Sequence, residues 1–233
     1  MNHRVLITGS SGLIGSALVP LLVNCGNQVR LLDVSITGEG AGDTRDRDSV
    51  HSAIAGCDGI IHLAAVSRVI WGEHKPDLCW ATNVGGLRNV LESASTSSKK
   101  PWVIFASSRE IYGQPDRLPA TEECRANPVN IYGRSKVAGE MLVETARREG
   151  LRACTIRLSN VFGSVHDHAD RVVPAFARAA AQGSPLRVDG AEHTFDFTHT
   201  DDVAAGIATL TALLGEGGTR HRRSTSSAGC PQP

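Results

Sequence analysis

The sequence predicts an α/β protein built on a doubly wound parallel sheet, and three observations predict this fold class. Short apolar runs typical of buried strands alternate with longer segments whose apolar residues recur at helical spacing. A glycine-rich turn joins the first strand to the first helix. The 233 residues suffice for one sizeable core with a small appendage. We expect a sheet domain over 1–163, a partial lobe over 164–214, from which the chain can return to the sheet, and a disordered tail over 215–233.

Composition restricts the partners and the compartment. The 24 Lys and Arg residues balance the 24 Asp and Glu residues, so neither a nucleic acid nor an anionic membrane is expected as a partner. No apolar run approaches the ~20 residues of a membrane span, and residues 1–10 show no signal-peptide pattern. The six cysteines lack CxxC spacing and are expected to be free thiols. We therefore expect a cytoplasmic protein.

Residues 4–33 are predicted to form a strand, a glycine-rich turn, a helix and a second strand that ends at Asp33. Such a turn brings the backbone and the helix N-terminus close to a pyrophosphate. Asp33 is placed to bind an adenosine ribose and to repel a 2′-phosphate, which favours NAD over NADP. The alternative is a structural turn beside a solvated Asp33. The turn residues expected to bind NAD are Gly9, Ser11, Gly12, Leu13, Ile14 and Gly15.

The next segments are predicted to complete the cofactor site. Few apolar residues follow Asp33, so the third strand of an ordinary dinucleotide fold is expected to be stunted. Asp43 is interpreted equally well as a contact to the adenine amino group and as an N-terminal acid of a helix over 46–55. A strand over 59–63 ends in small residues that leave room for a flat cofactor. The cofactor contacts expected here are Asp43, Thr44, Leu63, Ala64 and Ala65.

Two further segments bring polar side chains to the expected cleft. An amphipathic helix is predicted from Trp80 to Ala94, and Asn83 in its first turns either bonds a loop backbone or caps the helix. A buried strand over 102–106 stops at Ser107 and Ser108, whose hydroxyls should face the cleft.

Tyr132 and Lys136 stand four residues apart on a predicted helix, so both side chains leave the same face. A neighbouring ammonium favours the phenolate and should lower the tyrosine pKa from about 10 toward that of a general base. Ser108 could hydrogen-bond the same substrate oxygen. Taken alone, such a pair is more often a solvated helix face. The nucleotide turn and the serine-ended strand favour the catalytic interpretation.

The last third of the chain is less regular. A strand over 151–158 leads to Asn160, and a helix is predicted over 172–181. The strand-like start of FDFTHTDDVA should feed a helix capped by Thr200 or Asp201. Four loop residues have the side chains of metal ligands but lack a distant partner, so no metal site is expected. These residues are His166, Asp167, His168 and Asp170.

The motifs TGSSGLIG, HLAA, TNVGG, FASSREIYG, YGRSK, RLSNVFG and FDFTHTDDVA together resemble the extended short-chain dehydrogenase/reductases, in particular the NAD-dependent nucleotide-sugar epimerase/dehydratase family. The resemblance implies a Rossmann domain, tightly held NAD, a nucleotide-sugar substrate and a homodimer formed through the helices at 80–94 and 132–148. It implies the catalytic set Ser108, Tyr132 and Lys136. Cofactor contacts are also expected at Asn83, Ser107, Tyr132 and Lys136. The expected substrate contacts are Ser67, Ser108, Arg109, Glu110, Tyr132, Asn160, Val173 and Arg187.

The resemblance implies a 4-epimerase of UDP-glucose or UDP-glucuronate type that acts through a transient 4-keto sugar. One alternative is a 4,6-dehydratase, which uses an Asp-Glu pair where this chain has Arg109 and Glu110. Arginine cannot give up a proton at neutral pH, which disfavours this alternative. The other alternative is a non-catalytic NAD-binding module. Its basis is Phe195, which stands where the family has a phosphate-pairing arginine, together with a substrate lobe that looks truncated or replaced after residue 214.

Overall fold

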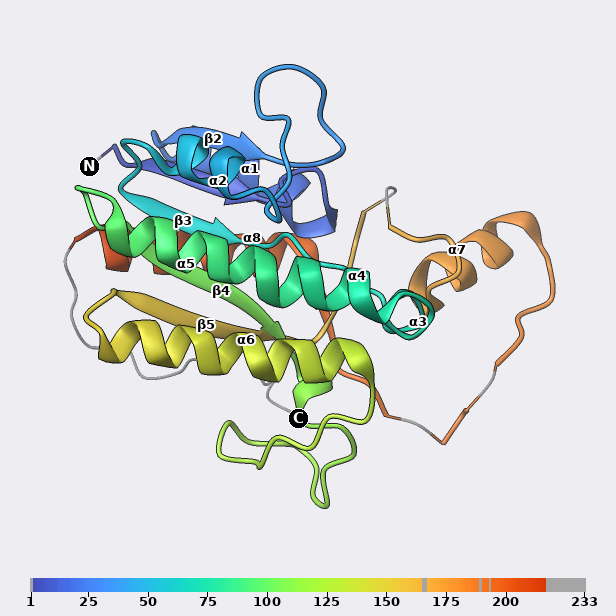
Figure 1. Ribbon diagram of the computed structural model, residues 1–233. Helices are drawn as coiled ribbons and strands as arrows, with labels where there is room; N and C mark the ends of the chain where they lie inside the picture. The colour runs from blue at the N-terminus through green and yellow to red at the C-terminus, as the bar shows by residue number, and fades with distance from the viewer. Residues whose placement is uncertain (1, 165–166, 189, 193, 217–233) are drawn as a thin grey trace.

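The computed structural model describes residues 2–164, 167–188, 190–192 and 194–216 (Figure 1). At its centre is a five-stranded parallel sheet with the order β2-β1-β3-β4-β5. The chain order reverses at β1, and the carboxyl ends of strands at such a point form a ligand crevice. The strands are β1 (Arg4–Thr8), β2 (Gln28–Leu32), β3 (Gly59–His62), β4 (Trp102–Ser108) and β5 (Ala153–Leu158).

Helices cover both faces of this sheet (Figure 1). Alternate residues of a strand point to opposite faces. Accordingly Val5 and Ile7 pack on the side of α1 and α8, whereas Leu6 packs on the side of the other three helices. The predicted doubly wound sheet is therefore confirmed. The helices are α1 (Leu13–Asn24) and α8 (Thr200–Gly215) on one face, and α2 (Arg47–Ile54), α5 (Leu87–Thr96) and α6 (Ile131–Arg148) on the other.

The segment between β2 and α2 makes a single bridge, Asp33 to Ala41, and no longer strand. This agrees with the stunted strand expected from its polar sequence. After β3 the chain forms two short helices, α3 (Val69–His74) and α4 (Pro76–Trp80). The helix predicted from Trp80 to Ala94 is interrupted, because residues Ala81–Gly86 form a π-helical segment, η1, before α5 begins.

Beyond β5 the chain leaves the large sheet and then returns to it. The strands β6 (Asn160–Phe162) and β7 (Phe197–His199) form a separate parallel pair. Between them, α7 (Val172–Gln182) lies away from the sheet and has no buried residue (Figure 1). The helix α8 then packs against α1. The domain boundaries at 163 and 214 stay a prediction.

The start of α8 corrects one expectation. We predicted that Thr200 or Asp201 caps this helix, but the cap is His199, whose Nδ1 accepts a hydrogen bond from Asp201 N at 3.2 Å. Thr200 is not free for this role, because its hydroxyl donates to the Leu13 carbonyl of α1 at 3.2 Å. The contact instead ties α8 to the helix that follows the glycine turn.

Three other expectations are not tested. Most of the predicted tail over 215–233 lies outside the described residues, as does His166. The homodimer through the helices at 80–94 and 132–148 stays a prediction. Among the described residues, no helix combines the length and the apolar character needed to cross a membrane.

Two glycines test how much the glycine turn depends on close packing. A Cβ at Gly15 in α1 would lie 2.5 Å from the Gly9 carbonyl oxygen, whereas a Cβ at Gly206 in α8 would meet nothing within 4 Å. We expect Gly15→Ala to lower the free energy of unfolding by about 1–3 kcal/mol. The matched control Gly206→Ala should raise it by about 0.5–1 kcal/mol, because alanine favours a helix over glycine. Denaturant unfolding measures both, and equal effects would contradict the close approach.

Candidate functional site

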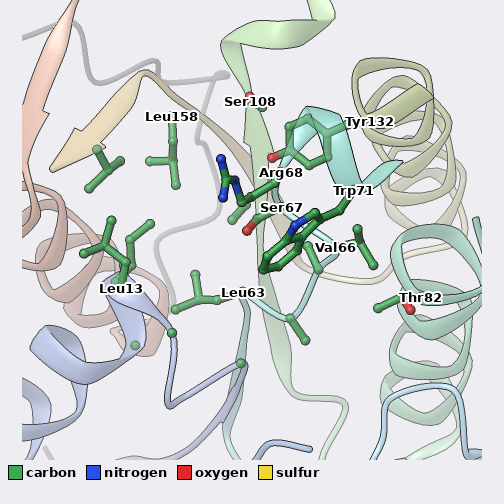
Figure 2. Close-up of a pocket in the computed structure, with 18 of the residues that line it drawn as sticks. Leu13, Leu63, Val66, Ser67, Arg68, Trp71, Thr82, Ser108, Tyr132 and Leu158 are labelled. Carbon is green, nitrogen blue, oxygen red and sulfur yellow. The ribbon is translucent and has the colours of Figure 1, made fainter. Parts of the chain in front are cut away.

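A cavity of about 1050 Å³ opens at the carboxyl ends of the strands, at the upper end of the ~300–1,000 Å³ range of small-molecule sites. It joins the glycine turn to the ends of β2, β3, β4 and β5. Leu13 after the turn, Leu63 after β3, Ser108 of β4 and Leu158 of β5 are labelled in Figure 2. The predicted cofactor contacts that line it are Gly9, Ser11, Gly12, Leu13, Ile14, Gly15, Asp33, Asp43, Thr44, Leu63, Ala64, Ala65, Ser107, Tyr132 and Lys136.

The glycine turn and Asp33 form one end of the cavity. Gly9 has a φ of 72°, and a Cβ there would lie 2.6 Å from the Ala64 backbone nitrogen. Only glycine therefore allows the turn to lie against the end of β3. The two carboxylate oxygens of Asp33 accept hydrogen bonds from Ser11 N and Ser35 N, each at 2.8 Å. Asp33 is buried, so the interpretation as a solvated acid is wrong.

Asp43 is not the acid that caps α2. The cap is Asp46, which accepts a hydrogen bond from Asp48 N at 3.0 Å. Asp43 lies farther from the helix and pairs with Arg45, and this hydrogen-bonded guanidinium lowers the pKa of Asp43. Because Asp43 lines the cavity, the adenine contact is the interpretation that stays as a prediction.

Asn83, predicted as a cofactor contact, does not line the cavity, and that contact stays a prediction. Asn83 is 1% exposed, and its side chain binds both backbone polar groups of Val66. Oδ1 accepts a hydrogen bond from Val66 N at 2.7 Å, and Nδ2 donates to Val66 O at 3.2 Å. It also donates to Ser135 Oγ of α6 at 2.9 Å. Asn83 thus holds the loop after β3 against α6, as the loop-backbone interpretation predicted.

The other end of the cavity carries Ser108 from the end of β4, with Tyr132 and Lys136 from the first turns of α6. Asn130 fixes where α6 begins, because its Oδ1 accepts a hydrogen bond from Gly133 N at 2.7 Å. Figure 2 shows the Tyr132 and Ser108 side chains at this end of the cavity.

The charge state at this end differs from the prediction. Burial raises the pKa of Tyr132 to about 12, and the Ser108 hydrogen bond opposes this only in part. Burial lowers the pKa of Lys136 to about 8. The expected lowering of the Tyr132 pKa by Lys136 is wrong for the protein alone, because the ammonium is directed to the Ala106 carbonyl oxygen of β4, at 2.7 Å.

A partly buried ion pair between α6 and β5 lies behind this end of the cavity, and sequence reasoning missed it. Glu140 accepts a hydrogen bond from Ser107 Oγ at 2.6 Å and pairs with Arg157 Nη2 at 2.7 Å. Its charge also acts to raise the pKa of Lys136, against the effect of burial. The available signal was its position one helical turn after Lys136, on the same face of α6.

Arg109 and Glu110 form a second network at the cavity wall. Arg109 Nη2 lies 2.8 Å from Glu110 Oε1, and Arg109 Nε donates to Asn160 Oδ1 at 3.3 Å. The other oxygen, Glu110 Oε2, accepts from Asn130 Nδ2 at 2.7 Å. The Arg109 guanidinium also lies 5.5 Å from the centre of the Phe195 ring. Both carboxylate oxygens of Glu110 are therefore engaged with the protein.

Six of the eight predicted substrate contacts line the cavity, and Val173 and Arg187 do not, because α7 and the loop after it lie beyond it. No group of three His, Cys, Asp or Glu that could hold a metal occurs in the described part of the chain. The lining residues that sequence reasoning missed include Arg68, Trp71, Thr82 and Arg171. Thr82 belongs to the TNVGG motif, whereas the other three carry no local motif and lie at the starts of the helices α3 and α7. The six are Ser67, Ser108, Arg109, Glu110, Tyr132 and Asn160.

Together, the parallel sheet, the glycine turn with a buried acid and the Ser-Tyr-Lys end are the features of the short-chain dehydrogenase/reductase class, whose members use a dinucleotide. The model of the NAD dependent epimerase/dehydratase family matches residues 5–221, and the chain belongs to this family. Membership in a family defined by NAD confirms the cofactor expected from Asp33. The residues present also fit NAD, because the three glycines of the turn and the buried Asp33 line the same end of the cavity.

Similar proteins with several activities are known. A UDP-glucose 4-epimerase of Streptomyces lividans is 31% identical, over 95% of this chain and 74% of its own length. A UDP-N-acetyl-alpha-D-glucosaminuronate decarboxylase of Bacillus cytotoxicus is 33% identical, over 90% of this chain and 72% of its own. The crystal structure of the UDP-glucose 4-epimerase of Brucella ovis with NAD is 29% identical, covers 93% of this chain and 75% of its own, and has a TM-score of 0.82.

The low pKa of Lys136 predicts how stability depends on pH. Its folded-state pKa of about 8 lies below the ordinary value of 10.5, so between these pH values the folded protein binds fewer protons than the unfolded chain. Stability therefore rises with pH in this window. Relative to Lys136→Met, the cofactor-free wild type should gain about 2 kcal/mol from pH 7 to 9.5. Denaturant unfolding of both proteins measures this, and parallel pH profiles would contradict it.

Proposed function

We propose that this protein is an NAD-dependent 4-epimerase of a UDP-hexose or UDP-hexuronate. The observation that carries the proposal is the meeting of Ser108, Tyr132 and Lys136 at one end of the cavity, opposite the glycine turn and Asp33. A cofactor anchored at the turn would extend toward a hydroxyl, a phenol and an amine. The similarity to UDP-glucose 4-epimerases supports the choice of substrate. A cytoplasmic location is part of the same proposal.

In the proposed reaction, Tyr132 removes the proton of the sugar C4 hydroxyl, and Ser108 donates a hydrogen bond to the same oxygen. NAD, when bound, accepts a hydride from the sugar and returns it. Loss of the hydroxyl proton and of a hydride from C4 leaves a 4-keto sugar. The sugar turns, the hydride returns to its other face and Tyr132 returns the proton, which gives the C4 epimer.

Tyr132 needs a lower pKa for this role than the value of about 12 that burial imposes. The Ser108 hydrogen bond and the Arg171 charge already act to lower it. Lys136 is a further group that can do so, because its ammonium lies 5.7 Å from the centre of the Tyr132 ring. We assign Lys136 two tasks: to hold the nicotinamide ribose and to favour the phenolate. Both require that the ammonium exchange the Ala106 carbonyl for partners in the cavity.

The geometry of Glu110 favours the epimerase over a 4,6-dehydratase. A dehydratase needs a free base at C5 and an acid at the C6 hydroxyl. The positions after Ser108 hold Arg109, which cannot serve as the acid, and Glu110, whose two oxygens are held by Arg109 and Asn130. A related dTDP-glucose 4,6-dehydratase of Streptomyces venezuelae has a TM-score of 0.80 to this chain at 29% identity, which makes the comparison worth testing.

Phe195 favours a second candidate, a non-catalytic NAD-binding module. It stands where the resemblance implies a phosphate-pairing arginine, and it is 45% exposed. A phenyl ring cannot make a charge-assisted bond to a phosphate. The presence of Ser108 beside Tyr132 in the cavity lining argues against this candidate, since Ser108 is expected to contact the substrate and not the cofactor.

Tyr132→Phe tests the assignment of the base. It removes the phenolic oxygen and keeps the ring, so we expect turnover of UDP-glucose or UDP-glucuronate to fall by about 10²–10⁴-fold while NAD stays bound. Chromatography of the nucleotide sugars measures turnover, and the bound cofactor is measured after heat release. Val188→Ala, on a half-exposed loop outside the cavity, is the control. Unchanged turnover in Tyr132→Phe would overturn the proposed mechanism.

The products distinguish the candidate functions. A C4 epimer supports the proposal, whereas a stable 6-deoxy-4-keto product with its ultraviolet absorbance in alkali identifies the dehydratase. NAD binding without turnover of UDP-glucose, UDP-glucuronate, dTDP-glucose or GDP-mannose identifies the module.

A further inference from the structure

One of the arginines that line the cavity has an unusual ion pair. In the pairs of Arg45, Arg109 and Arg171, the carboxylate side chain is less exposed than the guanidinium. The fourth pair is the reverse: the Arg68 side chain is 20% exposed, and that of its partner Asp170 is 65% exposed, with 2.6 Å between Nη2 and Oδ2. Arg68 thus presents a largely buried cation whose present partner lies mostly in solvent.

The position of Arg68 is well determined by its surroundings. It immediately precedes α3, and its guanidinium lies 5.5 Å from the centre of the Trp71 ring. That ring in turn meets His168 edge to face at 4.9 Å. In the loop before Arg68, the Asn83 side chain holds the Val66 backbone through two hydrogen bonds. The guanidinium is therefore held in place by more than its bond to Asp170.

Figure 2 shows the Arg68 guanidinium and the Tyr132 hydroxyl directed into the same part of the cavity. If Tyr132 faces the C4 hydroxyl, groups beside it face the neighbouring ring carbons. The substituent on C5, which is C6, is next to C4, whereas C1 with its diphosphate lies across the ring. The other neighbour of C4 is C3, whose hydroxyl is neutral, so C6 is the adjacent group that can carry a negative charge for a cation in this part of the cavity.

We propose that Arg68 is a specificity-determining residue that binds the C6 carboxylate of a nucleotide hexuronate. This inference rests on the proposed function and narrows its substrate to the uronate. The carboxylate replaces Asp170, whose own side chain lies mostly in solvent and is solvated again when it leaves Arg68. Guanidinium is always charged and matches a carboxylate with two parallel N–H groups. The exchange leaves no buried charge without a partner, because the released Asp170 is already solvated.

The test compares two ligands that differ only at C6, UDP-glucuronate and UDP-glucose, by calorimetric binding to the NAD-loaded protein. Wild type should bind UDP-glucuronate more tightly. Arg68→Gln should lower the affinity for UDP-glucuronate by about 10- to 100-fold and the affinity for UDP-glucose by less than about threefold. Arg178→Gln, which removes the same charge from an exposed position of α7 outside the cavity, should change neither.

Asp170→Asn provides an independent arm if Arg68→Gln does not fold. It removes the competing carboxylate from an exposed position and should raise the affinity for UDP-glucuronate by about two- to fivefold. Unchanged affinity in this variant, or an unchanged preference in Arg68→Gln, overturns the inference. An equal loss of affinity for UDP, UDP-glucose and UDP-glucuronate in Arg68→Gln also overturns the inference, because Arg68 would then bind the diphosphate.

Affinity and product formation are measured in separate experiments, so the two proposals can fail separately. An Arg68-dependent preference for UDP-glucuronate with no C4 epimer formed leaves the inference standing and removes the epimerase proposal. Epimer formation with no such preference does the opposite.

Discussion

The close contact between α6 and β4 is the constraint on which the Tyr132 end of the cavity depends. A Cβ at Gly139 would lie 2.6 Å from the Phe105 ring and 3.1 Å from Leu87, so only glycine lets the helix lie this near the strand. At that distance Lys136 reaches the Ala106 carbonyl and Glu140 reaches the Ser107 hydroxyl. The same closeness removes water from Tyr132 and Lys136, and this dehydration sets the direction of both pKa values.

The fold and most of the cavity were predictable because their signals are local. Apolar runs identify strands buried on both faces, and the glycine turn followed by Asp33 specifies one backbone geometry. The side chains of Tyr132 and Lys136 share a face of α6 by helical periodicity alone. These predictions need only the sequence near each residue.

What could not be predicted depends on contacts between distant segments. His199 caps α8 because Thr200 is occupied by α1, which the sequence around residue 200 does not reveal. Likewise the direction of the Tyr132 pKa depends on how completely the cavity wall excludes water. Arg68 enters the cavity from a loop whose path is determined by Asn83, 15 residues further on.

The π-helical segment at Ala81–Gly86 changes the direction in which side chains point before and after it along one continuous helical stretch. Its extra residue per turn places Asn83 toward the loop, while the later residues Leu87 and Val90 still point into the core. Removing one residue from this segment would restore a regular helix and rotate everything before it by about 100°. Natural length variation should therefore be poorly tolerated here, although no side chain of the segment except Thr82 borders the cavity.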